Sequence, residues 1–509
     1  MGPRLGALEP RLVVPVAAVA AAALRFPGLL YPLGSDEAGF TLVAREWDPE
    51  PGSLYGTYWV DRPPTLIALI RWSDLVGGPY FARVLAALGC VVTVLAAAGT
   101  ARAALRYAGE TDKRYLARTG AWVAVLAAAL TSTAMIDPIM AKGEILGIPF
   151  VMISFWLGLR ALGRGRVDGA ALVLAAAAGL AAVLAQGMKQ NLVSGLVFGS
   201  ALLLMTRLHH RITTPDLLRL GAATVAGAAV PVLAVCGWAM HAGVGLDALW
   251  YTVYGFRFDA LEVLARGEGH HLERAGYLLA IFCGSGAAFV LAGVALHRRR
   301  IRAFSPTLLT AAVLVIGVDV IALLLGGSFW RPYLFTMVPG IVLCAVLLLA
   351  VRVEVARRAR YLVVFAAVVS IGATAAWTVV DLSGLAPSPA TRTGVALRAA
   401  AETGDTVVVY GGRAEIVLAS GMHSPYQHLW SLPMRTLDPR LADLRRLLGG
   451  TRAPTWVVMW VSPGAWDGTG AVLEPLLKDR YRTHGRTCNG NPVYLVRGAH
   501  RAVPDPNCS

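Results

Sequence analysis

Charged side chains are scarce in this sequence. Asp, Glu, Lys and Arg together make up 15% of its 509 residues, whereas hydrophobic residues account for 56%, and the mean hydropathy is +0.59. Ordinary soluble domains carry about 25% charged residues. The composition therefore argues against a soluble globular protein and predicts a polytopic membrane protein.

Cysteine is also rare, with six residues in the whole chain, too few to form the disulfide framework of a small secreted domain. Cys488 and Cys508 lie near the C-terminus, and the sequence leaves open whether they pair in an oxidising compartment or stay reduced. The other four lie in apolar runs and are expected to pack as small apolar residues; they are Cys90, Cys236, Cys283 and Cys344.

Several signatures of known sites and folds are missing. The chain shows no internal repeat, and its C-terminal part has no nucleophile elbow, P-loop or metal motif. Gly411-Gly412 follows a β-like run, but the pattern is too short for a dinucleotide-binding fingerprint. His270 and His271 are adjacent rather than one helical turn apart, which disfavours a metal site built from them alone.

Long apolar runs are what the sequence has in place of these features. A membrane-spanning helix needs about 20 predominantly apolar residues, and about eleven runs meet this need. The runs near 168–186 and 190–206 are the weakest, because Lys189 and Gln190 lie in a hairpin tip or a polar break between them. The predicted spans are 12–33, 80–100, 119–136, 144–163, 168–186, 190–206, 217–241, 275–296, 306–326, 332–351 and 361–380.

The net charge of +15 is explained by topology rather than by a nucleic-acid partner. Basic residues gather in alternate short loops, near 102–118, 164–166, 207–219, 298–302 and 352–360. Such loops are cytoplasmic by the positive-inside rule. The N-terminus is then cytoplasmic, and the first span stays attached because it lacks a small-residue cleavage pattern. The segments 34–79, 137–143, 243–274, 327–331 and everything after about 381 would be extracytoplasmic.

A polar segment over residues 34–64 follows the first span. Residues 36–47 are predicted to form a short helix with Ser35 as its N-cap, and capping alone would explain Asp36 and Glu37. Residues 48–60 are a loop whose aromatic residues suit the membrane–water boundary. Residues 65–75 form an amphipathic stretch that is expected to lie in the interface.

Other polar residues interrupt the apolar part of the chain. Asp137, Lys142 and Glu144 mark either a span boundary or a site, because carboxylates at membrane depth are costly. Lys189 needs an anion or a route to water, and Asp319 needs a cation or a proton. The loop 243–274 either covers a substrate, with Tyr251, Tyr254 and Arg257, or forms an aromatic belt without a substrate role.

The composition changes after residue 381. A Pro- and Ser-containing linker leads to residues 390–509, where amphipathic segments alternate with β-like runs at 406–410, 454–461 and 492–496. This alternation predicts a small α/β domain outside the membrane. The expected organisation is therefore a transmembrane domain over 1–381 and an extracytoplasmic α/β domain over 382–509.

Three ordered blocks carry a resemblance to a known family. SDEAGFTLVAREW, LYGTYWVDRPPTLIAL and GPYFARVLAALGCVVTVL resemble the N-terminal third of GT-C superfamily membrane glycosyltransferases of the protein O-mannosyltransferase and aminoarabinose transferase type. In that family an Asp-Glu pair precedes an Asp-His/Lys-Pro-Pro block. Asp36 and Glu37 match the first, and Asp61-Arg62 match the second with Arg62 in the basic position. The resemblance implies a mainly α GT-C fold of about eleven spans.

The resemblance also implies site roles. Asp36 would be the catalytic base with Glu37 beside it, while Arg62, Lys142, Lys189 and Arg331 would hold the donor phosphate. Asp61, Asp137 and Glu144 would orient the acceptor or a metal. The substrate loop would present Tyr251, Tyr254 and Arg257, together with Tyr333. Two departures from the family are Lys142-Gly143 in place of Asn-Thr, and Pro332 in place of a histidine.

The residue types suit the chemistry of a sugar donor on polyprenyl phosphate. A phosphate leaving group needs no general acid, so a base for the acceptor hydroxyl and cations for the developing charge are sufficient. The leading hypothesis is an inverting glycosyltransferase in the cell membrane that moves a monosaccharide to an extracytoplasmic acceptor. It needs no prosthetic group, although a divalent cation is allowed. The Ala-, Arg- and Gly-rich composition suggests a bacterial source, with mannose or arabinose donors.

Two rival functions remain open. A transporter or lipid flippase could use the same intramembrane charges, but it predicts repeat symmetry that the sequence does not show. A non-catalytic membrane protein could bind glycans or partners through its C-terminal domain. This second rival differs from the transferase in tolerating replacement of Asp36 by asparagine.

Overall fold

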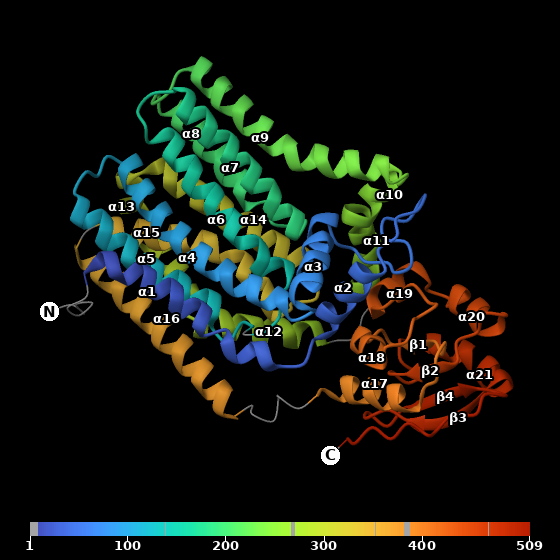
Figure 1. Ribbon diagram of the computed structural model, residues 1–509. Helices are drawn as coiled ribbons and strands as arrows, with labels where there is room; N and C mark the ends of the chain where they lie inside the picture. The colour runs from blue at the N-terminus through green and yellow to red at the C-terminus, as the bar shows by residue number, and fades with distance from the viewer. Residues whose placement is uncertain are drawn as a thin grey trace. The chain divides into compact units, whose positions relative to one another are not determined.

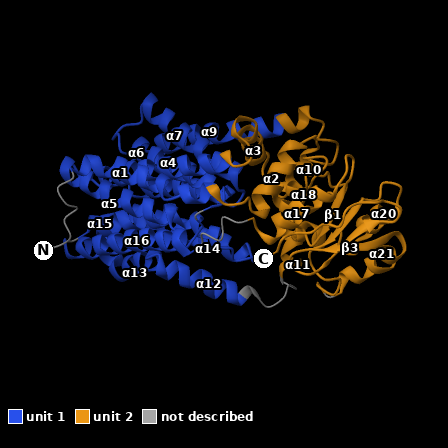
Figure 2. Ribbon diagram, turned by 60° about the horizontal axis from the view of Figure 1, so that its bottom comes forward, with its two compact units in different colours: residues 1–29, 82–237, 269–380 blue, residues 30–81, 238–268, 381–509 orange. Residues whose placement is uncertain are grey.

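The computed structural model describes residues 9–137, 139–265, 270–351, 353–380, 387–466 and 468–508. Residues 381–386 of the expected linker and Arg352 of one basic loop lie outside the described residues. The chain divides into two compact units (Figure 2). Unit 1 comprises Met1–Leu29, Ala82–Gly237 and Gly269–Val380, and unit 2 comprises Leu30–Phe81, Trp238–Glu268 and Asp381–Ser509.

All the secondary-structure elements in the described part of unit 1 are helices (Figure 1). Its elements are α1 (Pro10–Ala23), η1 (Phe26–Leu30), α4 (Phe81–Tyr107), α5 (Lys113–Ser132), α6 (Gly143–Leu162), α7 (Gly169–Met188), α8 (Ser194–Leu208), α9 (Thr214–His241), α12 (His270–Gly284), α13 (Ala287–Phe304), α14 (Pro306–Leu325), η3 (Arg331–Met337), α15 (Val338–Ala350) and α16 (Val353–Val380).

Each predicted apolar run overlaps at least one helix, but the runs do not all form full spans. Among the described residues, eight helices are long and apolar enough to cross a membrane, or nine if one bent pair counts as a span. Helix α5 begins with two basic residues, and α8 has only 15 residues. The span expected over 275–296 is bent rather than continuous, because Gly286 adopts φ +86° and α12 and α13 meet at 71°.

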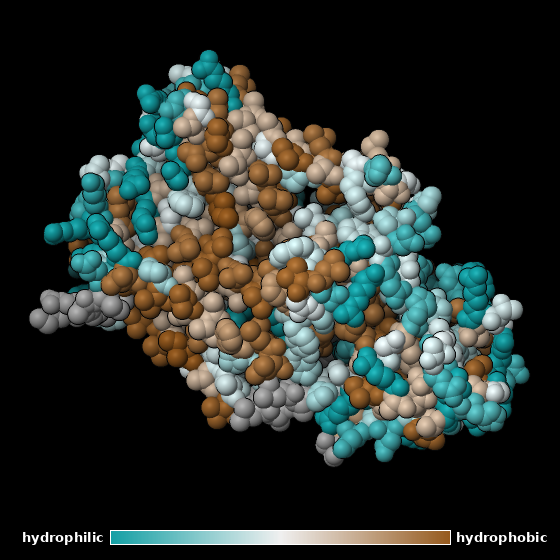
Figure 3. Space-filling model, viewed as in Figure 1, coloured by the Kyte–Doolittle hydropathy of each residue, from teal (hydrophilic) through white to brown (hydrophobic). Residues whose placement is uncertain are grey.

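Burial differs sharply among the spans of unit 1. In the span Arg331–Ala350, 89% of the apolar window is buried, against 11% in Thr214–His241. Helix α15 therefore lies at the centre of the unit, where it packs against α5, α13, α14 and α16. The outer helices expose large apolar side chains such as Val225 and Leu233, and hydrophobic residues cover much of this unit in Figure 3. The chain is a polytopic membrane protein, as its composition predicts.

Unit 2 combines short helices with one small sheet. Its elements are α2 (Ser35–Arg45), α3 (Pro64–Gly77), α10 (Leu246–Trp250), the π-helix η2 (Tyr251–Gly255), α11 (Phe256–Ala265), α17 (Pro389–Ala400), β1 (Val407–Tyr410), α18 (Ala414–Ser420), α19 (Ser431–Leu437), α20 (Ala442–Gly449), β2 (Trp456–Met459), η5 (Thr469–Leu473), α21 (Glu474–Arg480), β3 (Tyr481–Arg486) and β4 (Pro492–Val496).

The sheet has the order β1-β2-β4-β3, with β1 and β2 parallel and the other pairs antiparallel. The three predicted β-like runs became β1, β2 and β4, and the small α/β domain is confirmed. Strand β3 has the sequence YRTHGR, and only its first residue is buried. An edge strand of this kind carries no apolar alternation, so its sequence pattern did not predict it.

Three segments distant in sequence are bound together inside unit 2. The Trp59 backbone N–H donates to the Gln427 carbonyl at 3.0 Å, and the Trp59 and Phe256 rings lie 4.3 Å apart. Helix α18 packs on α2, and α11 packs on α19. Residues of the first polar segment and of the 238–268 segment thus belong to one folded unit with the C-terminal sheet.

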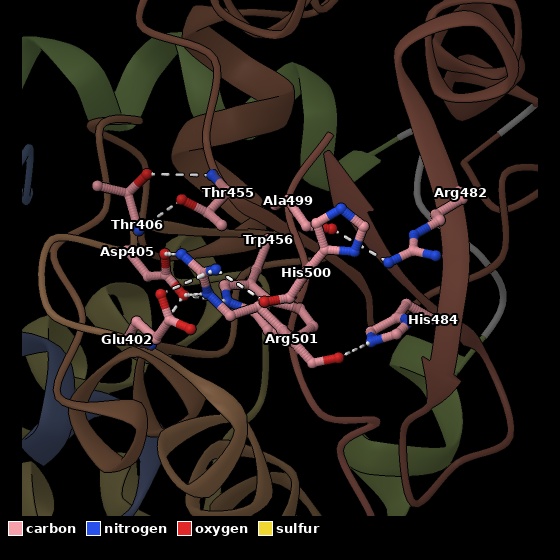
Figure 4. Close-up of polar contacts among 10 residues, drawn as sticks. All are labelled: Glu402, Asp405, Thr406, Thr455, Trp456, Arg482, His484, Ala499, His500 and Arg501. Atoms are coloured by element: carbon pink, nitrogen blue, oxygen red, sulfur yellow. Dashed lines mark hydrogen bonds and ion pairs between the residues drawn. The ribbon is translucent and has the colours of Figure 1, made fainter. Parts of the chain in front are cut away.

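The C-terminal tail of unit 2 is held by ionic and covalent contacts. Arg501 pairs with both carboxylate oxygens of Asp405, which also accepts from the indole N–H of Trp456 (Figure 4). Desolvation and the hydrogen bonds act in opposite directions on Asp405, and the bonds win, so its pKa is lowered. Cys488 and Cys508 form a disulfide, with Cα atoms 5.3 Å apart.

Candidate functional site

The first turn of α2 carries the two carboxylates predicted to be catalytic, and the structure gives them different partners. Glu37 is 4% exposed, and its Oε2 accepts from the Gly34 backbone N–H at 3.1 Å. Asp36 Oδ1 accepts from the Trp430 indole N–H, also at 3.1 Å. Gly34, not Ser35, is the N-cap. Capping therefore explains Glu37, while the described contact of Asp36 belongs to another segment of unit 2.

Asp61 lies between two arginine side chains of unit 2. Arg62 Nη1 approaches Asp61 Oδ1 at 2.7 Å, and Arg257 of α11 pairs with Asp61 Oδ2. The Arg62 carbonyl accepts from the Tyr55 hydroxyl at 2.5 Å, and its guanidinium lies 5.6 Å from the Phe40 ring centroid. Asp61, Arg62 and Arg257, predicted separately from the sequence, form one cluster, which we call the arginine cluster.

Two aromatic residues of the 48–60 loop, which the sequence predicts to face the membrane–water boundary, are buried inside the protein. Tyr55 and Tyr58 are 1% and 0% exposed, because their hydroxyl groups have partners inside unit 2. The Tyr58 hydroxyl accepts from the Ser424 N–H at 3.1 Å. Burial raises the pKa of both phenols, so they stay neutral hydrogen-bonding groups. Their task in this structure is to hold the loop that leads to the arginine cluster.

The predicted substrate loop folds as α10, the π-helix η2 and α11. Tyr251 and Tyr254 are each 36% exposed, and the Tyr251 hydroxyl donates to Asp259 at 2.7 Å. Burial and this bond raise the pKa of Tyr251 to about 12. A π-turn inside a run of helix is often associated with function, and here it precedes the turn that carries Arg257. The side chains of His270 and His271 lie outside the described residues.

A second ionic cluster lies in unit 1, where α6 begins and α7 ends. Lys189 Nζ is 2.5 Å from Glu144 Oε1 and 4.1 Å from the Tyr333 ring centroid. Glu144 and Lys189 are 3% and 6% exposed. A Cβ at Gly143 would lie 2.4 Å from the Met188 carbonyl, so glycine lets the two helix ends approach. Glu144, Lys189 and Tyr333 are called the lysine cluster below.

Snorkelling to water does not account for Lys189, because its ammonium group is buried against the Glu144 carboxylate and the Tyr333 ring. The adjacent Lys142 is the N-cap of α6. Asp137 is 3% exposed, and its Oδ1 accepts from the backbone N–H groups of Ile139 and Met140 at 2.9 and 3.0 Å. This is an Asx turn, so Asp137 shapes the loop before α6.

Two further charged residues of unit 1 have no role in these clusters. Arg331 is exposed at the start of η3. Asp319 of α14 is 1% exposed and pairs with the Ser194 hydroxyl at the beginning of α8. The sequence predicts a cation or a proton for Asp319, and the structure adds a hydrogen bond from the Ser194 hydroxyl. The contact ties α14 to the end of the segment that carries Lys189.

Two residues that sequence reasoning missed bind carbonyl or carboxylate groups near the predicted site residues. Arg25 is 2% exposed and donates to the Asp137 carbonyl at 3.1 Å. Trp430 binds Asp36 across 394 residues of sequence. A buried arginine in the first span was a signal that could have been followed, whereas Trp430 carried none. Among the described residues, no group of three or more His, Cys, Asp or Glu side chains could hold a metal ion.

Comparison with known proteins shows similarity in structure. The chain is similar to ArnT from Cupriavidus metallidurans in the apo state, with 14% identity, a TM-score of 0.57, and coverage of 95% of this chain and 97% of that one. The same ArnT bound to undecaprenyl phosphate gives 15% identity, a TM-score of 0.56, and coverage of 97% and 99%. No family model and no curated protein matches the chain.

A second similar structure is an archaeal protein. Oligosaccharyltransferase AglB from Archaeoglobus fulgidus, in complex with an inhibitory peptide and a dolichol-phosphate, gives 13% identity and a TM-score of 0.50. The alignment covers 96% of this chain and 74% of AglB. Both neighbours are GT-C proteins, so the GT-C fold expected from the sequence is confirmed.

Proposed function

We propose that this chain, which has the GT-C fold, transfers a monosaccharide from a polyprenyl-phosphate donor to an acceptor on the extracytoplasmic face of the membrane. The observation that supports this most directly is a carboxylate, Asp36, in the same folded unit as two arginines flanking Asp61. Undecaprenyl phosphate in ArnT and dolichol-phosphate in AglB support the donor class. A fold alone does not define an activity, so the residues must carry the proposal.

Asp36 is proposed as the base. An ionised carboxylate can accept the proton of the acceptor hydroxyl as that oxygen attacks the anomeric carbon. The carbon–phosphate oxygen bond breaks on the opposite side, which inverts the anomeric configuration. The leaving group is a lipid phosphate that is already an anion, and therefore no acid is needed to protonate it. Glu37 caps α2 and is proposed to hold Asp36 at a rigid helix end.

Arginine side chains are proposed to stabilise the phosphate. The guanidinium of Arg62 offers a planar fork that matches phosphate oxygens, and Arg257 adds a second cation on the other side of Asp61. Asp61 orients both. Tyr251 and Tyr254 are proposed to contact the sugar or the lipid from the π-helix.

The lysine cluster is proposed to take part in donor binding. Lys189 is desolvated, so its charge acts over a short distance at low effective dielectric. Glu144 neutralises it before donor binding, and Lys142 and Arg331 are further candidates for phosphate contacts. Asp137 is proposed to keep the loop before α6 in shape.

We also propose that the N-terminus is cytoplasmic, because the basic loops alternate along the chain as the positive-inside rule requires.

The proposal is tested with purified protein in lipid nanodiscs and radiolabelled polyprenyl-phosphate sugars, including mannose and arabinose donors. Wild type should transfer or hydrolyse at least one donor. Asp36→Asn keeps the shape of the side chain but removes the base, so kcat should fall about 10²- to 10⁴-fold. Asp479→Asn, on an exposed position of α21, is the matched control and should leave kcat unchanged.

Two outcomes would reject the proposal. Full transfer by Asp36→Asn would remove Asp36 as the base. No turnover of any polyprenyl-phosphate sugar by wild type would favour a transporter or a glycan-binding protein. Counterflow of labelled lipid in proteoliposomes would then separate those two functions.

A further inference from the structure

The helix that carries Asp36 is in contact with a tryptophan of the C-terminal sequence. Trp430 precedes α19, and its indole N–H donates to Asp36 Oδ1 at 3.1 Å. Its ring also lies 5.8 Å from the Phe40 ring, one turn further along α2. The indole therefore covers the first two turns of the helix with both a polar and an apolar contact.

A glycine on α2 makes room for this ring. A Cβ added at Gly39 would lie 2.2 Å from Trp430 Cζ2 and 2.6 Å from Cη2. No real Cβ contact is that short, so any other residue at position 39 would displace the indole. Glycine in the middle of a helix is less favourable than alanine. The close approach of the indole explains why position 39 is a glycine.

A glycine after β1 lets the backbone of Trp430 approach closely. Gly411 and Gly412 follow β1 and adopt φ +108° and +67°. A Cβ at Gly412 would lie 2.4 Å from the Trp430 carbonyl carbon, and the next residue, Arg413, forms a bridge with Trp430. Gly412, which the sequence pattern does not link to a nucleotide, thus lets the chain after β1 meet the residue that contacts Asp36.

We propose that Trp430 is a positioning residue for Asp36: it fixes the carboxylate from the C-terminal part of the chain, through a fit that Gly39 and Gly412 permit. This inference rests on the proposed role of Asp36 as base. A base acts only when its oxygen is aimed at the acceptor proton. The indole N–H of Trp430, whose backbone is bridged to Arg413, restricts the rotation of the Asp36 side chain. The C-terminal domain is then required for the rate of transfer.

The test compares two tryptophans in the same unit. Trp430→Phe keeps a ring on Gly39 but removes the N–H. Trp456→Phe removes the same kind of bond, since the Trp456 N–H donates to Asp405 at the same 3.1 Å. Trp430→Phe should lower kcat about tenfold, the scale of one hydrogen bond to a charged group, and change the donor KM less than about twofold. Trp456→Phe should lower the melting temperature at least as much but keep kcat.

A second variant and a second readout protect the test from misfolding. Gly39→Ala leaves the indole N–H intact but forces the ring away, so it should lower kcat like Trp430→Phe. In protein labelled with 5-fluorotryptophan, ¹⁹F NMR should show the Trp430 resonance, assigned by its loss in Trp430→Phe, moving in Asp36→Ala. It should not move in Asp479→Asn.

The results separate this proposal from the proposed function. If wild type turns over a donor but Trp430→Phe keeps wild-type kcat, the positioning role is wrong and the transferase assignment stands. If the Trp430 resonance does not shift in Asp36→Ala, the contact between Trp430 and Asp36 is absent in solution. This result would also reject the positioning role alone. If no donor is turned over by wild type, both proposals are overturned together.

Discussion

The arginine cluster and the lysine cluster place opposite charges together in different surroundings. In the arginine cluster the side chains of Arg62 and Arg257 keep 17% and 28% of their surface exposed. In the lysine cluster the Lys189 and Glu144 side chains keep 8% and 4%. A partly exposed cation can meet a ligand without rearrangement, whereas a buried pair must first open. The first is suited to capture of an anion, and the second to the stability of the fold and to donor binding after a rearrangement.

The number of cations per carboxylate differs as well. Asp61 is shared by two guanidinium groups, so the arginine cluster carries an excess positive charge. The Glu144–Lys189 pair by itself carries no net charge, and Lys142 also acts electrostatically on Glu144. An excess of positive charge attracts phosphate over a Debye length of about 8 Å. A balanced buried pair attracts much less.

Breaking the buried pair should have the largest effect. Lys189→Met leaves Glu144 charged and desolvated, which costs about 3–5 kcal/mol when one partner of a buried pair is removed. The double variant Glu144→Gln with Lys189→Met should recover most of that loss. The free energy of unfolding, from denaturant titration in mixed micelles, measures it.

The control for this prediction is an exposed pair in unit 2. Arg45 binds Asp74 through two bonds of 2.7 and 2.9 Å, but 46% of the Arg45 side chain is exposed. Arg45→Met should therefore destabilise far less than Lys189→Met. Equal losses for the two variants would mean that burial does not distinguish the clusters.

The arginine cluster should respond in function more than in stability. Arg62→Lys keeps the charge but loses the planar fork that reaches Asp61 and a phosphate together. The donor KM should rise about tenfold, the scale of one lost charge-assisted bond, while the free energy of unfolding falls by ~1 kcal/mol. Arg45→Lys, which alters an equally forked pair with Asp74, should not change KM. If Arg62→Lys keeps the wild-type donor KM, Arg62 does not bind the donor phosphate and only pairs with Asp61.

The sequence predicted the parts of this molecule that depend on local pattern. Apolar runs located the helices of unit 1, and β-branched runs located three of the four strands, because burial in a span or a central strand leaves a local signature. Strand β3 and the break at Ser285-Gly286 left no such signature. An edge strand can be polar, and one left-handed glycine is enough to bend a span.

In the candidate site, too, sequence patterns did not predict contacts between residues that are far apart in the sequence. Ordered blocks placed Asp36, Asp61 and Arg62 in one segment, so their shared unit followed from proximity in sequence. The pairing of Glu144 with Lys189 spans 45 residues, and that of Asp36 with Trp430 spans 394. Both are consequences of tertiary packing. A tryptophan or a lysine in isolation does not say which carboxylate it meets.

The smallest expected effect concerns a pH-dependent contact in unit 2. His423 Nδ1 lies 3.0 Å from Glu46 Oε2, and the hydrogen bond to Glu46 raises the pKa of His423 above 6.5. A raised folded pKa adds stability that is fully present below the unfolded pKa of about 6.5 and is lost as pH rises through the folded value. Because nearly half of the His423 side chain is exposed, this contribution should stay below ~1 kcal/mol.

Glu46→Gln should therefore lower the melting temperature of the protein at pH values below about 6.5 and have a shrinking effect as pH rises. Asp74→Asn provides the control, because the partner of Asp74 is an arginine that does not titrate in this range, so its effect should be constant. A Glu46→Gln difference that does not change with pH would assign the stabilisation to the hydrogen bond from neutral Tyr58, which also contacts Glu46 at 3.3 Å.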